Sequence, residues 1–406
     1  MDRRQYLTAL GGVAAGTAGV VAVHHAGDGG SGDDIGEESG PNQSQAGTGT
    51  GSGEGTGQAD SPPAGERGTA GVPDEELNRG APKDGIPAIV DPVFAPNWET
   101  EVAGEAVAGV ELRPDDEVIG IERAGIARAY PLKLLRRHEV VNDRLGGPQL
   151  ITYCPVCDAG LVTDRTVAGT TRTFGVSGYL YRANLVLYDE ESESLWSQLG
   201  ARAIQGPLTG TRLDRTGSAV TTWGDWQRAA PETSVLVPPP ASNTVVGPVS
   251  FNYSLEFYQR RERITDRYPD YGPLGALEWT DTRLQRRTVV VGVSTDSASR
   301  AYAARDVQRA DPINDIVGSL PVLVTTTSNG RPRVYLRRVE GQTLTAGVNE
   351  AGDLVAGGSR WSRLRGTALD GPYEGTRLPV APGRGPLYWA AWLAFNPEST
   401  VYGLDS

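Results

Sequence analysis

An internal repeat constrains the fold of this chain more than any other feature. Residues 128–143 return 172 positions later as residues 300–315, and residues 206–213 return 165 positions later as residues 371–378. Further positions recur in the same order at a spacing of 165 or 166: Trp196, Trp223, Trp226, Pro231 and Glu232 match Trp361, Trp389, Trp392, Pro397 and Glu398. Ordered matches at a nearly constant spacing indicate a duplicated structural unit. Because the spacing falls from 172 to 165, the second copy has a net loss of seven residues between Asp143 and Trp196.

Each copy has the pattern of a β domain with few short helices. Runs rich in β-branched residues predict strands at 118–121 and 289–293, and shorter apolar runs predict strands at 127–130, 149–153, 160–164 and 185–188. Pro131 is a favourable first helical residue, so we expect a helix over 132–141 with Leu134, His138 and Val141 on one face. The prediction is a β-rich α+β fold of two tandem, duplicated β domains packed as a pseudo-symmetric pair.

The N-terminal segment has the pattern of an export signal. Arg3 and Arg4 precede an apolar, glycine-rich run over 9–23, which is typical of a twin-arginine signal. The run is marginal in length for spanning a bilayer, so residues 1–26 are expected to be either a cleaved signal or an N-terminal membrane anchor. Both alternatives predict an extracytoplasmic protein that is secreted or tethered to the membrane.

The rest of the chain divides by composition. Residues 27–83 are rich in glycine, serine and acidic residues and are predicted to be a disordered tether. We expect the first repeat at 84–238, a connection rich in proline and then tyrosine at 239–282, and a degenerate, structural second repeat at 283–406.

Charge argues against nucleic acid as a partner. The formal net charge is −12, and residues 27–80 alone carry eleven acidic residues and two arginines. The remaining body is close to neutral and offers no basic patch of the kind that nucleic acid requires. Lysine occurs only at Lys83 and Lys133, a bias toward arginine that resembles the proteins of a halophilic archaeon.

One motif carries chemistry. Cys154 and Cys157 are the two cysteines of the chain, in a Cys-Pro-Val-Cys sequence between two predicted strands. The redox motif of thioredoxin-like proteins begins a helix instead, and a turn between strands is more typical of a metal-binding knuckle. A small disulfide or a pair of buried thiols is the alternative interpretation.

The second copy lacks this chemistry. At the repeat spacing His138 corresponds to Ala310, Cys154 to Thr326 and Cys157 to Asn329, whereas Tyr130, Asn142 and Asp143 are retained. We therefore expect an active first copy, with His138 joining the two cysteines, although a hydrogen-bonded core histidine is an equal alternative. The further candidates are Asp158 as a metal ligand and, as residues lining the site, Tyr153, Asn142, Asp143, Ser177 and Gln198.

Two other chemistries are disfavoured by neighbouring residues. A haem-attachment motif requires histidine directly after the second cysteine, where this chain has Asp158. Ser177 is not in a nucleophile elbow, because Tyr179 stands where that motif requires glycine.

The first copy also resembles a known family. Its motifs, in chain order, are AYPL at 129–132, HEVVND at 138–143, TYCPxC at 152–157, FGVSG at 174–178 and SLWSQ at 194–198. Together they are similar to a widespread family of exported bacterial and archaeal domains of unknown function, over about residues 84–406. The resemblance supports the location of the site and implies no particular reaction. Asp158 departs from the family, in which glycine is expected.

Three functions fit these residues. The first is an exported surface domain whose Cys154, Cys157 and His138 hold Cu(I) or Zn(II), since soft sulfur ligands favour these metals. The second is a thiol–disulfide oxidoreductase, in which Cys154, Cys157 and His138 are the catalytic residues. The third is a non-enzymatic interaction module in which Cys154 and Cys157 form a structural disulfide. The sequence identifies neither the small-molecule or protein partner nor the reaction.

Overall fold

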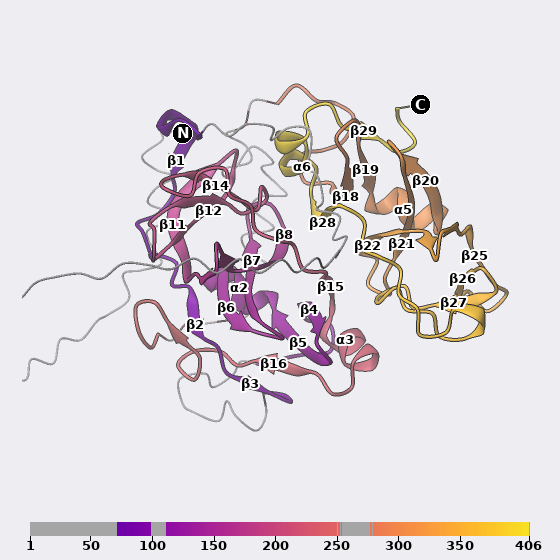
Figure 1. Ribbon diagram of the computed structural model, residues 1–406, viewed down its shortest axis with the longest axis horizontal. Coiled ribbons are helices and arrows are strands. Elements are labelled where there is room, and N and C mark those ends of the chain that lie inside the picture. Colours follow the sequence, from indigo (N-terminus) through magenta and orange to yellow (C-terminus); the bar gives the residue numbers. More distant parts are fainter. Residues whose placement is uncertain are drawn as a thin grey trace, which may run out of the picture.

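The computed structural model describes residues 71–98, 111–249, 251, 253, 277 and 279–405. The predicted export signal and the tether up to residue 70 lie outside these residues. Figure 1 shows two groups of strands, one coloured indigo to magenta and the other orange to yellow, which are the first and second copies of the repeat. The predicted β-rich fold with few short helices is confirmed.

Within the described residues, the first copy contains three five-stranded sheets, one two-stranded sheet and two short α-helices. The strands are β1 (Leu77–Arg79), β2 (Ile89–Asp91), β3 (Phe94–Ala95), β4 (Glu117–Arg123), β5 (Ile126–Pro131), β6 (Val140–Arg144), β7 (Pro148–Cys154), β8 (Ala159–Asp164), β9 (Thr166–Val167), β10 (Thr170–Thr171), β11 (Phe174–Tyr181), β12 (Asn184–Asp189), β13 (Leu195–Ser197), β14 (Arg202–Gln205), β15 (Ala219–Thr222), β16 (Ser234–Leu236) and β17 (Asn243–Thr244). The helices are α2 (Leu132–His138) and α3 (Trp223–Ala229). The sheet orders are β15–β4–β5–β16–β3, β17–β2–β6–β7–β8 and β1–β11–β12–β13–β14.

The second copy repeats much of this strand order. Its elements are β18 (Val289–Ser294), β19 (Ser299–Ala303), α5 (Ala304–Ala310), β20 (Ile313–Val317), β21 (Leu320–Thr326), β22 (Pro332–Leu336), β23 (Arg338–Val339), β24 (Gln342–Thr343), β25 (Ala346–Val348), β26 (Leu354–Ala356), β27 (Ser359–Trp361), β28 (Gly383–Tyr388), α6 (Trp389–Phe395) and β29 (Thr400–Val401). Three strand orders correspond between the copies: β28–β18–β19–β29 to β15–β4–β5–β16, β20–β21–β22 to β6–β7–β8, and β25–β26–β27 to β11–β12–β13. Whether the copies pack as a pseudo-symmetric pair stays a prediction.

Retained polar residues connect elements of the fold in both copies. Asp143 on β6 accepts hydrogen bonds from Arg128 and Tyr130 on β5, and Asp315 on β20 accepts the same pair from Arg300 and Tyr302 on β19. Because these groups hold neighbouring elements together, a structural role is sufficient reason for their recurrence. Asp143 thus belongs to the scaffold, where it joins the sheet that contains β6 to the sheet that contains β5.

Two predicted boundaries are wrong. The helix expected over 132–141 ends at His138, because Glu139 adopts a left-handed conformation with φ of 58° and the β-branched Val140 and Val141 continue as strand β6. The expected tether does not extend to residue 83. Val72 is buried and its N–H donates to the Ile204 carbonyl at 2.8 Å, and β1 pairs with β11.

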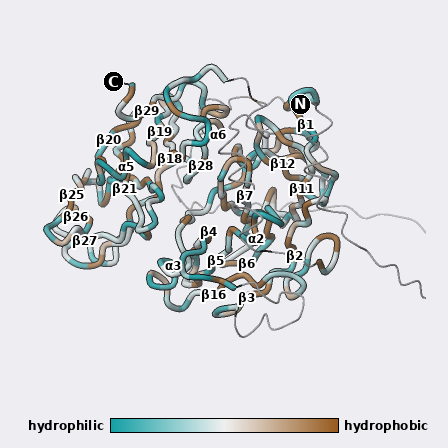
Figure 2. Tube along the Cα trace, turned by 180° about the vertical axis from the view of Figure 1, so that it is seen from behind, coloured by the Kyte–Doolittle hydropathy of each residue, from teal (hydrophilic) through white to brown (hydrophobic). Residues whose placement is uncertain are grey.

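Strand β7 separates two hydrophobic clusters. Its side chains alternate, so Leu150 and Cys154 pack in one cluster while Ile151 and Tyr153 pack in another. Figure 2 shows hydrophobic segments along strands such as β18, as expected for sheets with buried faces. Among the described residues, no helix has the length and apolar character needed to cross a membrane.

Candidate functional site

The two cysteines occupy the turn between β7 and β8. Cys154 is the last residue of β7, and Cys157 lies in the turn, where its N–H donates to the Cys154 carbonyl at 3.1 Å. Asp158 then adopts a left-handed conformation with φ of 52°, which reverses the chain into β8. Both cysteines are free thiols, and their exposures are only 1% and 0%. The sequence therefore placed the motif correctly, on a turn between strands.

A hairpin from another sheet covers the thiols. At its tip, Arg182 and Ala183 connect β11 to β12 with φ values of 50° and 59°. The Ala183 carbonyl lies 3.3 Å from the Cys157 Sγ as a hydrogen-bond acceptor, and the Asn184 Nδ2 donates to the same sulfur at 3.5 Å. The Leu185 N–H donates to the Cys154 sulfur. Three consecutive residues of the hairpin thus bond to the two cysteines.

The two thiols have opposite pKa shifts. Burial disfavours ionisation of Cys154, but hydrogen bonds from the Cys157 thiol and from the N–H groups of Leu185, Cys157 and Val156 outweigh it and lower the pKa of Cys154. Burial raises the pKa of Cys157 well above its ordinary value, and so do its hydrogen bond to Cys154 and the charge that forms there. A thiolate is therefore favoured at Cys154, with Cys157 protonated beside it.

A polar network orients the amide that bonds to Cys157. The Asn184 Nδ2 also donates to the Gln198 Oε1 at 2.8 Å, and the Gln198 Nε2 donates to the Thr152 Oγ1 at 3.1 Å. The Leu199 N–H donates to the Asn184 Oδ1 at 3.0 Å, which fixes the orientation of the amide. Gln198 was expected to line the site and lies one hydrogen bond from the residue that contacts Cys157. Asn184 was missed by sequence reasoning.

The structure narrows the seven-residue loss of the second copy to the segment that holds Asn184. Asn142 exchanges two hydrogen bonds with the backbone of Phe174, and Asn314 does the same with Ala346. These matched pairs lie 172 residues apart, whereas Trp196 and Trp361 lie 165 apart, so the seven-residue loss falls after Phe174. That window holds the hairpin, which is long in the first copy, with β11 of eight residues, and short in the second, with β25 of three. The second copy has therefore lost both cysteines and the long form of the hairpin that contacts them.

His138 has its own partners. It is fully buried, its Nδ1 lies 2.7 Å from the Pro87 carbonyl and its Nε2 lies 2.8 Å from the Tyr253 hydroxyl. The carbonyl can only accept, so Nδ1 carries the proton and Nε2 accepts from Tyr253. Burial lowers the pKa of His138 to about 4, so the ring is neutral at pH 7. Among the described residues, no group of three or more His, Cys, Asp or Glu side chains is placed to hold a metal ion.

The other candidates are distributed around the turn. Asp158 accepts hydrogen bonds from the Tyr153 hydroxyl at 2.8 Å and from the Arg331 Nη1 at 2.6 Å. The Ser177 Oγ donates to the Val186 carbonyl at 2.6 Å, within the irregular part of the β11–β12 pairing. Asn142 supports the Phe174 backbone, as described above. Tyr153 and Asp158 therefore lie next to the cysteines, and Asp158 contacts the second copy through Arg331, whereas Ser177 stabilises the hairpin.

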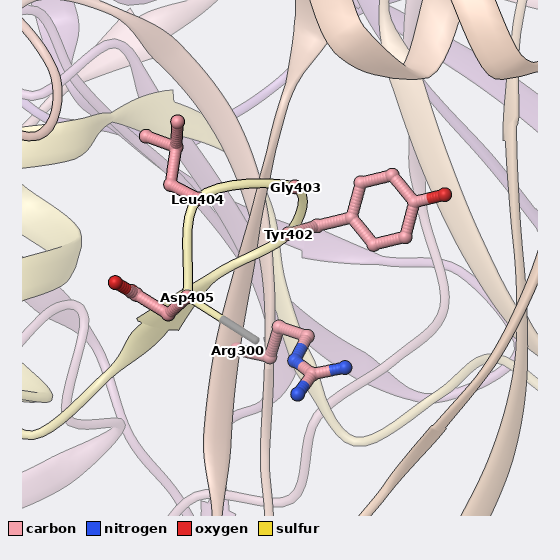
Figure 3. Close-up of a pocket in the computed structure, with 5 residues that line it drawn as sticks. All are labelled: Arg300, Tyr402, Gly403, Leu404 and Asp405. Carbon is pink, nitrogen blue, oxygen red and sulfur yellow. The ribbon is translucent and has the colours of Figure 1, made fainter.

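A shallow pocket lies in the second copy. Its volume is about 330 Å³, and Figure 3 shows its lining residues: Arg300, Tyr402, Gly403, Leu404 and Asp405. Arg300 is ion-paired with Asp315, and Asp405 is ion-paired with Arg283. The charged groups of this pocket therefore hold strands and the C-terminal turn together.

Comparison with known proteins gives one match. Residues 83–399 match the sequence model of a family described as "Protein of unknown function (DUF3179)". No curated protein and no solved structure matches the chain.

Proposed function

The chain belongs to the DUF3179 family of proteins of unknown function, and from that premise we propose that its first copy is a thiol–disulfide oxidoreductase module. Cys154 and Cys157 alternate between a dithiol and a disulfide. The observation that carries the proposal is a pair of neighbouring free thiols with unequal hydrogen-bond donors: the N–H groups of Leu185, Cys157 and Val156 donate to the Cys154 sulfur, which lowers the pKa of Cys154 and favours its thiolate over that of Cys157.

The reaction follows from this difference. The Cys154 thiolate attacks one sulfur of a partner disulfide, so a mixed disulfide forms and the other partner sulfur leaves as a thiolate. Cys157 then loses its proton and attacks the Cys154 sulfur, which forms the Cys154–Cys157 disulfide and releases the second partner sulfur. Two electrons pass from the cysteine pair to the partner, whose two sulfurs each gain a proton. The reverse sequence would oxidise a dithiol partner.

The pattern of loss in the second copy supports the proposal. Both cysteines and the long hairpin that bonds to their sulfurs are absent together from a copy that keeps the Asp143, Tyr130 and Arg128 equivalents. A change that removes the thiols and their hydrogen-bond donors, yet leaves the scaffold, is expected when the donors serve the thiols.

Export supports a disulfide partner. The twin-arginine pattern at Arg3 and Arg4 would deliver the domain outside the cytoplasm, secreted or membrane-tethered. Disulfides persist in that compartment, so both protein and small-molecule disulfides are available there as partners.

The test is a redox titration of the purified protein in glutathione buffers. We expect a reduction potential above about −230 mV, as in redox-active pairs, whereas a potential below about −300 mV would identify a structural disulfide and refute the proposal. Cys157→Ser should trap a mixed disulfide on Cys154, because the resolving thiol is missing. Cys154→Ser is the matched variant and should trap much less, because the remaining thiol has a raised pKa.

A soft metal ion held by the same two sulfurs is the second candidate. The N–H groups of Leu185, Val156 and Cys157 stabilise negative charge on Cys154, and a metal-bound thiolate benefits from the same donors. Cys154 and Cys157 would hold Cu(I) or Zn(II), while His138 would join only by giving up its hydrogen bond from Tyr253. Titration of the reduced protein with each ion tests this. Stoichiometric binding that survives in His138→Ala and is lost in Cys154→Ser would favour the metal over the redox couple.

A further inference from the structure

We infer that the second copy is a cover for the cysteine turn, and that its contact with residues 156–158 must open before either thiol can react with another molecule. The inference rests on the proposed thiol chemistry and concerns the regulation of that site. It assigns a function to a copy that lacks the cysteines.

Three consecutive residues of the turn lie at the boundary with the second copy. Val156 packs against a small apolar cluster whose buried members are Ala183 of the hairpin and Ala390 of the second copy. The Cys157 carbonyl accepts a hydrogen bond of 2.8 Å from the Tyr388 N–H. Asp158 is ion-paired with Arg331 at 2.6 Å. An apolar contact, a backbone hydrogen bond and an ion pair therefore hold the same short turn against the second copy.

Figure 1 shows the elements that form the cover. Strand β28 lies beside β8, and α6 follows β28 in the chain. The hairpin that bonds to the cysteines contacts this helix as well, because the Arg182 Nη1 donates to the Ala394 carbonyl at 3.0 Å. Both segments that surround the thiols are thus held by the β28–α6 segment of the second copy.

Arg331 bridges two carboxylates of the first copy. Besides Asp158, its Nε donates to the Glu117 Oε1 at 2.8 Å, and its side chain is only 16% exposed. It lies between β21 and β22, the turn that corresponds to the cysteine turn in the first copy. The turn that lost its cysteines therefore contacts the turn that retained them.

The burial of the thiols makes opening necessary. Disulfide exchange requires a partner sulfur to come within bonding distance of the Cys154 sulfur, whose residue is 1% exposed. The copies are also joined away from the turn, for example by the ion pair between Arg365 and Glu122 at 2.6 Å. Local release of residues 156–158 can therefore expose the thiols while the copies stay together.

The experiment measures how fast dithiobis(nitrobenzoate), a disulfide reagent, labels the cysteine thiols of the reduced, full-length protein. Arg331→Ala removes the bridge at the turn, and Arg365→Ala is the matched control, because it removes an ion pair between the copies at another place. We expect Arg331→Ala to accelerate labelling about tenfold or more, since a lost charge-assisted hydrogen bond shifts an opening equilibrium by about that factor, and Arg365→Ala to change it by no more than about twofold.

Two further measurements keep the test decisive. Arg331→Lys retains the charge but cannot bridge both carboxylates as the guanidinium does, so it should give an intermediate rate even if Arg331→Ala folds poorly. Unfolding rates in the same buffer show whether labelling is faster than global unfolding, as local opening requires.

The outcomes separate the cover from the redox proposal. Equal labelling rates for wild type and both Arg331 variants, equal acceleration by Arg365→Ala, or wild-type thiols as reactive as those of a cysteine peptide would each overturn the cover. Slow wild-type labelling that Arg331→Ala accelerates supports it, even if the reduction potential is that of a structural disulfide and the redox proposal fails.

Discussion

Lowering the pH from 7 to 5 should destabilise the protein through His138, the one histidine among the described residues. Its ring is fully buried and its pKa is lowered from 6.5 to about 4. The unfolded chain therefore takes up a proton near pH 6.5, whereas the folded protein takes it up only near pH 4. Between these values the unfolded state binds more protons, so the free energy of unfolding falls as the pH falls.

The magnitude follows from the shift. A difference of about 2.5 pKa units corresponds to about 3 kcal/mol when fully expressed, of which about 2 kcal/mol is lost between pH 7 and pH 5. The contribution of His138 to the free energy of unfolding is retained above about pH 6.5 and is lost below about pH 4. Carboxylates with lowered pKa, such as Asp315 and Asp281, lose their own contributions only at lower pH, so they do not obscure this window.

Urea denaturation of wild type and His138→Gln at pH 7, 6 and 5 measures the effect. Glutamine can donate to the Pro87 carbonyl and accept from Tyr253 as the neutral ring does, but it does not titrate. We expect the wild type to lose about 2 kcal/mol more than the variant between pH 7 and pH 5. Parallel curves for the two proteins would refute the account of His138 as a neutral, buried residue.

Two further predictions concern the scaffold and the tail. Gly292→Ala should destabilise the second copy by about 3 kcal/mol or more through overpacking, because the new Cβ would lie 2.4 Å from the Trp392 ring. Gly347→Ala, which has nothing within 4 Å, is the matched control, and equal unfolding free energies for the two variants would contradict this packing. Deletion of residues 29–70 should shift Tm by no more than about two degrees, because Ile35 is the one large apolar residue of this segment and there is little surface to bury. A calorimetric Tm lowered by about ten degrees would show that the segment packs on the body.

Conservation of the scaffold between the copies explains why the fold was readable. Tyr130 and Asp143 recur as Tyr302 and Asp315, and in both copies the tyrosine donates to the carboxylate. Short runs of β-branched and apolar residues located β4, β7 and β8 to within a residue or two of their observed bounds. These features depend on short-range pattern and on repetition, both of which a single sequence displays.

The cysteine site was readable only in part. The sequence by itself determined that Cys154 and Cys157 occupy a turn between strands, and that the second copy lacks them. It did not determine which groups contact their sulfurs. Ala183 and Asn184 reach Cys157 from a hairpin 26 and 27 residues further along the chain. Such contacts depend on how one sheet packs against another, which no local pattern encodes.

Tertiary structure decided the role of His138 as well. Proximity in sequence and joint loss in the second copy had suggested that it joins the cysteines. In the fold, α2 places His138 against Pro87 and Tyr253. Tyr253 belongs to the same hydrophobic cluster as Ile151, whereas Cys154 packs in the other cluster. The side chains of a strand alternate between its two faces, so residues near in sequence separate wherever a sheet has a core on each side. Arg331 shows the converse, because packing of the second copy on the first brings it from 173 residues away to Asp158.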